Sequence, residues 1–434
     1  MNDKSNRINN LQTSRRKFIK SSAALGSLSI LPGSIAAMAN KNELSYTKKI
    51  SESKSIIGNY GSWANGLMEN PPKLSLRNAK WRDTDSWRKE ALEKAKDNIS
   101  APDIGGTPEV TVKKKYTYDG LEIEELSWQL PYGRQTEAIL LKPTGAKGQL
   151  PAILGLHDHG GNKYFGKRKI TKTSDQMHPM MANHQRDYYE GNAWANEIAK
   201  RGYVVLVHDA FDFASRRVMF EDMSEIPWGH CSTKGKSDTN PEDQKNIDVY
   251  NAWAGEHEHI LAKSLFCSGT TWPGVVLAED QIALNILSER KEVDSDHLGC
   301  AGLSGGGVRT VYLGGMDHRI KCAVCVGFMS TWSDFLLNKS FTHTWMTYAP
   351  LMPKYLDFPE ILGLRAPLPT MTLNNDQDGL FTLSEMKRAD SILQEVFKKA
   401  GANDHYKGGF YPGPHKFDAQ MQADAFNWFD TWLK

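Results

Sequence analysis

Short apolar runs separated by polar stretches extend along most of the chain. Residues 116–142 alternate apolar and polar side chains around Pro131-Tyr132-Gly133, which predicts an antiparallel hairpin. Later runs at 151–156 (PAILGL) and 368–374 (LPTMTLN) have the length of buried strands, so parallel strands are expected to follow the hairpin. Residues 418–433 instead carry apolar residues at helical spacing and predict a final helix. The pattern indicates an α/β protein.

Candidate chemistry begins with residues 299–307, Gly-Cys-Ala-Gly-Leu-Ser-Gly-Gly-Gly. Ser304 stands in a G-x-S-x-G motif between a short apolar run and a helical pattern. This arrangement is typical of a nucleophile elbow, in which glycines permit a turn tight enough to expose the serine hydroxyl. Because serine alone is a weak nucleophile, a histidine base and an acid are expected downstream.

The acid is expected in the loop after the run 368–374. Asp376 and Asp378 both lie there, and Gly379 indicates a sharp turn directly after Asp378. We therefore favour Asp378, with Asp376 as the alternative.

The base is expected to be His415. It follows the short strand pattern 409–411 through Pro412-Gly413-Pro414, so it lies where a strand ends. His405 is the alternative, but it precedes that strand and is expected at the opposite edge of the sheet.

Ester chemistry also needs backbone N–H groups that stabilise a negatively charged oxygen. Gly305, directly after the serine, is expected to supply one donor. The second is assigned to the backbone N–H of His159, or of Gly160, in the loop His157-Asp158-His159-Gly160-Gly161 after the strand 151–156.

The same loop permits a different interpretation, because His157 and His159 alternate as a metal pair could. A metal site would need further ligands, and the other histidines lie in distant segments. His257 and His259 are expected to be surface or hydrogen-bonded residues of a polar helix. No metal and no cofactor is predicted.

Taken together, PAILGLHDHGG, RGYVVLVHDAFDFASRR, GTTWPGVVLAEDQIALNIL, GCAGLSGGGVRTVYLGGMDHRIKCAVCVGFMST, LNNDQDGLF and YPGPHKF resemble the α/β-hydrolase superfamily. Within it, residues 110–434 are similar to secreted bacterial proteins of the dienelactone-hydrolase-like and acetyl-xylan-esterase-like branch. The resemblance implies a mostly parallel sheet of the eight-stranded type with helices on both faces, and a Ser304, Asp378, His415 triad. Dienelactone hydrolases carry a cysteine as nucleophile, whereas related acetyl xylan esterases carry serine, as this chain does.

The N-terminal residues indicate export. Ser14-Arg15-Arg16-Lys17-Phe18 is a twin-arginine signature, followed by an apolar run to residue 35 and by Ala37-Met38-Ala39. We expect residues 1–39 to be a signal peptide read by the twin-arginine export machinery, and the mature protein to be periplasmic or secreted without a stable membrane anchor.

Charge and cysteine content add little to this picture. The formal net charge of +2 includes six Lys/Arg and one Asp in residues 1–39, so removing this +5 leaves −3, and no nucleic-acid partner is indicated. Cys231 and Cys267 could form a disulfide in an oxidising compartment or remain free thiols. Cys322 and Cys325 are three apart on a predicted strand, so they are expected on opposite faces.

Residues outside the predicted sheet form an N-terminal extension and an insertion. Residues 40–109 are expected to form a helical extension whose tryptophans (Trp63, Trp81, Trp87) pack on the body. Residues 210–272 are long enough for a lid over the nucleophile, where insertions govern substrate choice. Phe328, Met329 and Trp332 are candidates to line the pocket.

The sequence thus predicts an exported serine esterase that forms an acyl-enzyme on Ser304. Its substrate is expected to be a small-molecule or carbohydrate ester, such as an acyl group on a polysaccharide. The alternatives are a metal-dependent hydrolase using His157 and His159, and a non-catalytic binding protein with a hydrolase fold.

Overall fold

The computed structural model describes residues 54–238 and 242–434. The predicted signal peptide, including Arg15 and Arg16, and the first part of the predicted extension lie outside the described residues.

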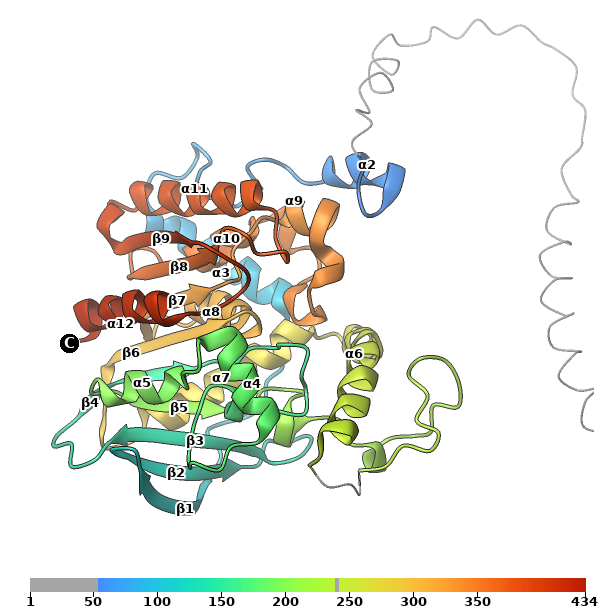
Figure 1. The fold of residues 1–434 in the computed structure, drawn as a ribbon. Helices are drawn as coiled ribbons and strands as arrows, with labels where there is room; N and C mark the ends of the chain where they lie inside the picture. Colours follow the sequence, from blue (N-terminus) through green and yellow to red (C-terminus); the bar gives the residue numbers. More distant parts are fainter. Residues whose placement is uncertain (1–53, 239–241) are drawn as a thin grey trace, which may run out of the picture. The chain divides into compact units, whose positions relative to one another are not determined.

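A nine-stranded sheet runs through the described part of the chain (Figure 1). Its strands lie in the order β1-β2-β3-β5-β4-β6-β7-β8-β9. The first three strands and the β3–β5 pair are antiparallel, and every pair from β5 to β9 is parallel. The bounds are β1 (Val110–Tyr118), β2 (Leu121–Trp128), β3 (Thr136–Pro143), β4 (Leu150–Gly155), β5 (Val204–His208), β6 (Val293–Leu303), β7 (Ile320–Val326), β8 (Thr370–Asn375) and β9 (Tyr406–Tyr411).

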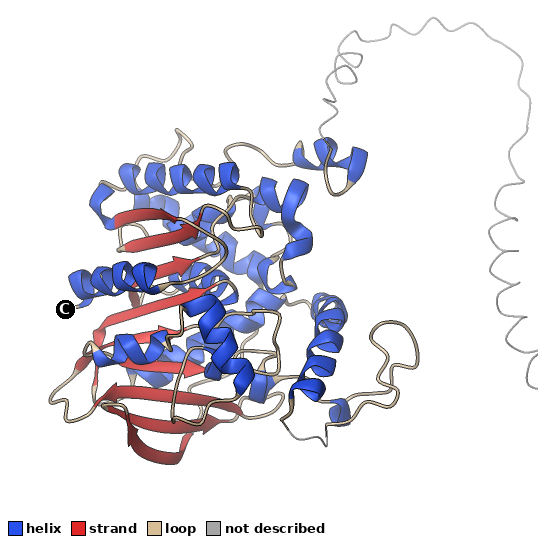
Figure 2. Ribbon diagram, viewed as in Figure 1, coloured by secondary structure: helices blue, strands red, loops and turns tan. Residues whose placement is uncertain are grey.

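Helices cover both faces of this sheet (Figure 2). Apolar side chains of one set join a core on the first face: α3 (Thr84–Ile99), α7 (Trp272–Ser288), α8 (Gly305–Met316), α10 (Phe358–Gly363) and α11 (Leu383–Lys399). A second set packs on the other face: α4 (Pro179–Tyr189), α5 (Trp194–Lys200) and α12 (Ala419–Leu433). This layering is the α/β-hydrolase fold that the sequence predicted.

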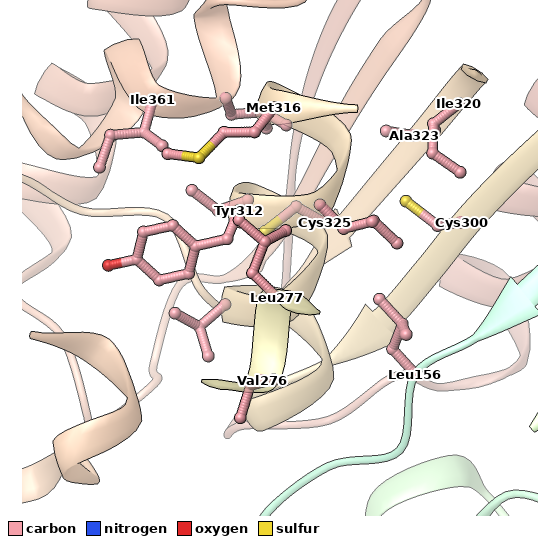
Figure 3. Packing of buried hydrophobic residues seen from close by; sticks show 14 of the residues in the cluster. Leu156, Val276, Leu277, Cys300, Tyr312, Met316, Ile320, Ala323, Cys325 and Ile361 are labelled. Atoms are coloured by element: carbon pink, nitrogen blue, oxygen red, sulfur yellow. The ribbon is translucent and has the colours of Figure 1, made fainter. Parts of the chain in front are cut away.

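Alternation along the strands explains the two cores. Successive strand residues point to opposite faces, so Leu154 joins the first core and Ile153 the second. Cys325 likewise belongs to the first core (Figure 3), and Cys322 to the second. The two thiols are therefore separated by the sheet, as expected, and both are unbonded.

The N-terminal extension contains α2 (Gly61–Asn65) and α3. Trp87 on α3 is fully buried, and its indole N–H donates to the Leu74 carbonyl. Trp81 is partly buried against the same core. Trp63, in contrast, is 65 % exposed, so the expectation that it packs on the body was wrong. Its helix has only five residues and buries only Gly61.

Between β5 and α7 the chain leaves the sheet. This insertion contains short helical turns and α6 (Gln244–Cys267), a 24-residue helix whose N-terminus is capped by Asp243. Cys231 and Cys267 of the insertion are both free thiols, Cys231 buried and Cys267 exposed.

Within residues 54–238 and 242–434, no helix has the length and hydropathy needed to cross a membrane.

Candidate active site

Ser304 stands at the turn where β6 meets α8. Its backbone angles, φ 56° and ψ −115°, are strained for a residue with a side chain, as in a nucleophile elbow. Glycine is required beside it, because a Cβ on Gly306 would collide with the Leu156 carbonyl after β4. The sequence motif therefore produces the turn that its residues predicted.

Two loops bring an acid and a base together at the same edge of the sheet. Asp378 follows β8, His415 follows β9, and His415 Nδ1 lies 2.6 Å from Asp378 Oδ2. The other oxygen of this buried carboxylate accepts from the Leu380 N–H at 2.9 Å. His415 Nε2 is buried and has no hydrogen-bond partner among the described residues.

Gly327 makes room for this histidine. It follows β7 with φ +56°, and a Cβ there would lie 2.9 Å from His415 Cε1. Ser304 and His415 line one pocket, so the structure gathers the three predicted residues at one site.

The two alternative residues occupy other positions. Asp376 is exposed and accepts a hydrogen bond from the Gly413 N–H at 3.1 Å, which stabilises the loop rather than the histidine ring. His405 lies before β9, where its Nδ1 is 2.6 Å from the Pro367 carbonyl, at the other end of the strand from His415.

The loop after β4 lies against the elbow. A Cβ on Gly305 would be 2.7 Å from the backbone nitrogen of His159, so the backbones of these two residues are in close contact. On the interior side, Lys169 Nζ donates to the carbonyls of Asp158 and His159, each at 2.8 Å. Because a trans peptide directs its C=O and N–H oppositely, the His159 N–H points away from Lys169. The Gly160 N–H points away from Lys169 for the same reason, so it is the close contact between Gly305 and the His159 nitrogen that favours His159 over Gly160 as the second oxyanion donor.

His157 does not have a free nitrogen for a metal. Its Nε2 accepts from the Ala210 N–H at 3.2 Å, and its Nδ1 lies 3.0 Å from the Asp158 carbonyl. Burial also lowers the pKa of His157 well below the ordinary histidine range. Within the part of the chain that the structure describes, no group of three or more His, Cys, Asp or Glu residues could hold a metal ion.

Asp212 and Glu258 of the insertion form a buried charged cluster with Lys163 of the loop after β4, and Glu258 lines the pocket. Lys163 Nζ lies 2.6 Å from Asp212 Oδ1 and 2.9 Å from Glu258 Oε1 of α6. The same Glu258 oxygen is 2.7 Å from His159 Nε2. Burial favours the neutral form of Glu258, but Lys163 and His159 outweigh it and hold the pKa of this carboxyl below its usual range. Burial raises the pKa of Asp212 to about 7.

The pocket around Ser304 has a volume of about 470 Å³. Among the described residues, no lysine or arginine lines it, and its aromatic residues include Phe341, which is 74 % exposed at the surface. The lining residues are Asp158, His159, Gly160, Gly161, Tyr188, Gly255, Glu258, Leu303, Ser304, Gly305, Phe328, Phe341, Thr342, His343, Thr344, Trp345, Leu380 and His415.

Of the three residues expected to line this pocket, only Phe328 does so. Met329 is fully buried in the first core, and the Trp332 indole N–H donates to the Leu356 carbonyl in the interior at 3.1 Å. The expectation for Met329 and Trp332 was wrong because both side chains pack into the first core, and an apolar sequence does not reveal whether a side chain faces the core or the pocket.

Sequence reasoning also missed residues that line the site. Glu258, Gly255 and Tyr188 line the pocket, although each lies far from Ser304 in the sequence. Gly255 and Glu258 lie in the predicted lid, which was their only local signal, whereas Tyr188 lies on α4 outside it. Lys163, which no motif singled out, is fully buried beside Glu258.

Comparison with known proteins is consistent with this architecture. No family model matches the chain. A Bacillus subtilis protein called "Putative hydrolase YtaP" is 24% identical over 314 residues, which cover 72% of this chain and 88% of that protein.

Solved structures share the fold at low sequence identity. A "putative acetyl xylan esterase" from Bacteroides fragilis has a TM-score of 0.60 and 16% identity, covering 84% of each chain. A glucuronoyl esterase from Solibacter usitatus has a TM-score of 0.54 and 14% identity, covering 83% of this chain and 97% of that one. These structures show that the chain has the α/β-hydrolase fold.

Proposed function

We propose that the protein is a serine carboxylic-ester hydrolase. The observation that carries the proposal is the 2.6 Å contact between His415 and Asp378 beside a serine on a strained elbow. A buried carboxylate against Nδ1 fixes the histidine tautomer in which Nε2 can accept a proton. Nε2 is the ring atom that has no other hydrogen-bond partner among the described residues.

In the proposed reaction, Ser304 Oγ attacks the carbonyl carbon of the ester while His415 Nε2 takes the hydroxyl proton. The N–H groups of Gly305 and His159 stabilise the resulting oxyanion. The carbon–oxygen bond to the alcohol then breaks, and His415 gives its proton to that alcohol. Water repeats these steps on the acyl-serine, which releases the acid and restores Ser304.

For the substrate, we propose carbohydrate esters such as acylated polysaccharides. The neighbouring structures are named for acetyl xylan and glucuronoyl esters, and the pocket of this protein is open and carries exposed aromatic surface at Phe341. Aromatic faces suit sugar rings, whose C–H groups are apolar. The lining contains carboxylate, hydroxyl and imidazole groups that can bond sugar hydroxyls.

A panel of acetyl, feruloyl and glucuronoyl esters tests both parts of this proposal. The purified protein is expected to hydrolyse at least one carbohydrate ester, and the Ser304→Ala variant none of them above background. Hydrolysis confined to simple aryl or alkyl esters would contradict the substrate class but leave the esterase mechanism in place. Equal rates for the variant and the wild type would refute the mechanism.

We propose further that the protein reaches the periplasm or the exterior by the twin-arginine route. This proposal rests on Ser14-Arg15-Arg16-Lys17-Phe18 and the apolar run that follows. Replacing Arg15 and Arg16 together by lysine should leave the precursor in the cytoplasm, because the two charges remain but the guanidinium groups are lost. Unchanged export in fractionated cells would contradict this route.

A further inference from the structure

Glu258 is not part of the triad, yet it contacts the loop that supplies an oxyanion donor. Its Oε1 is 2.7 Å from His159 Nε2, while His159 Nδ1 accepts from the Gly161 N–H at 3.1 Å. Because Nδ1 is an acceptor, the ring proton is on Nε2, and the His159 ring donates to Glu258. The ring also packs edge-on against Phe213, with 5.3 Å between ring centres.

The oxyanion loop is therefore anchored from two sides. Lys169 holds its carbonyls from the interior, and Glu258 holds the His159 ring from α6 of the insertion. The second anchor comes from a distant segment, because Glu258 and His159 are 99 residues apart in the sequence. Loss of the Glu258 contact would free the His159 ring but leave the Lys169 contacts with the loop carbonyls in place.

A buried charge holds Glu258 in position. Lys163 Nζ is 2.9 Å from Glu258 and lies 4.4 Å above the centre of the Trp272 ring. Lys163 also donates its backbone N–H to Asn251 Oδ1 of α6 at 2.9 Å, so this helix is joined to the loop 157–163 at two points. Asp212 is paired with Lys163, whereas Glu258 contacts both Lys163 and His159. Of these two carboxylates, only Glu258 therefore contacts the His159 ring.

We propose that Glu258 is a positioning residue for catalysis. Through its contact with the His159 ring, it makes the position of the oxyanion donor on His159 depend on the position of helix α6. This inference rests on the serine esterase proposed above. The Glu258–His159 contact is expected to stabilise the transition state, because the carbonyl oxygen of the substrate becomes negatively charged only as Ser304 attacks. Substrate binding in the ground state is expected to depend little on it.

The test is steady-state kinetics of the full protein with 4-nitrophenyl acetate at pH 7. In Glu258→Gln, kcat is expected to fall roughly ten- to hundredfold while KM stays within about twofold, since small displacements of a catalytic group have effects of this size. The inhibition constant for an aryl trifluoromethyl ketone, which forms an oxyanion with the serine, should rise in parallel with the fall in kcat/KM. A residue needed only for packing would not produce this split.

Asp212→Asn is the matched control. It changes the other carboxylate of Lys163 and leaves the Glu258–His159 contact in place, so kcat is expected to remain within about threefold of the wild type. Equal losses in the two variants, a change in KM alone, or an unchanged kcat in Glu258→Gln would overturn the proposal.

A second variant keeps the test valid if Glu258→Gln fails to fold. His159→Phe retains an aromatic ring and the backbone N–H but cannot donate to Glu258, so it is expected to reproduce the loss in kcat. The double variant should show no further loss, because both changes remove one contact. Additive losses would overturn the proposal. Wild-type activity no higher than that of Ser304→Ala would instead refute the esterase function itself.

Discussion

The two walls of the pocket are built in different ways. On one wall, Ser304 and His415 each lie in a loop or turn after a sheet strand, and Asp378 lies after another strand and contacts His415, so the strand ends determine the positions of all three. On the other wall, Glu258 is held by a buried ion cluster that joins α6 to the oxyanion loop. The first wall is thus positioned by the backbone of the sheet, whereas the second is positioned by contacts between charged side chains of distant segments.

The largest effect should come from Ser304 on the first wall. Replacing Ser304 by alanine removes the nucleophile but no buried contact, so esterase activity should fall by about 10⁵-fold or more while thermal stability is retained. Activity and melting temperature measured on the same preparation check this. Substantial residual activity would show that the walls have been assigned the wrong roles.

A smaller effect is expected from the acid of the triad. Asp378→Asn should lower kcat by about 10³- to 10⁴-fold, because an amide no longer fixes the productive tautomer of His415. Asp376→Asn should change kcat less than about threefold, since Asp376 contacts the loop backbone and not the histidine ring. The kcat values of the two variants check this assignment. A large loss in Asp376→Asn and a small loss in Asp378→Asn would show that Asp376 is the acid of the triad.

The smallest effect concerns the second wall and is one of stability. Burial raises the pKa of Asp212 to about 7, above the value of about 3.9 for an unfolded aspartate. The folded state therefore holds this proton more tightly, and its contribution is full below about pH 4 and is lost as pH rises through 7. Asp212→Asn mimics the protonated acid and does not titrate, so only the wild type should lose stability as the pH rises. The unfolding free energy of the variant minus that of the wild type should therefore increase by on the order of 2 kcal/mol between about pH 5 and about pH 8.

Urea unfolding of both proteins at about pH 5 and about pH 8 measures this difference. A difference in unfolding free energy that does not change with pH would contradict the raised pKa of Asp212.

The first wall could be predicted from sequence because its signals are local. Glycines around Ser304, the turn after Asp378 and the prolines before His415 lie within a few residues of the group they position. The order of strands then brings the three loops together, and the resemblance to α/β-hydrolases supplied that order. Asp378 and His415 were preferred over Asp376 and His405 on the same local signals.

The second wall could not be predicted, because contacts between distant segments define it. Glu258 and His159 are 99 residues apart, and nothing near Lys163 in the sequence indicates a buried ammonium. The prediction that Met329 and Trp332 line the pocket was wrong for a related reason. Their apolar character fits a pocket and a core equally well, and only the course of the chain after β7 decides between them.

Covalent labelling of Ser304 tests the central claim most directly. A serine-reactive aryl phosphonate is incubated with the wild type and with Ser304→Ala, and the modified residue is located by peptide mass spectrometry. We predict one adduct on Ser304 of the wild type, formed together with the loss of esterase activity, and none on the variant. An active enzyme that is not labelled, or an adduct on another residue that abolishes activity, would contradict the account.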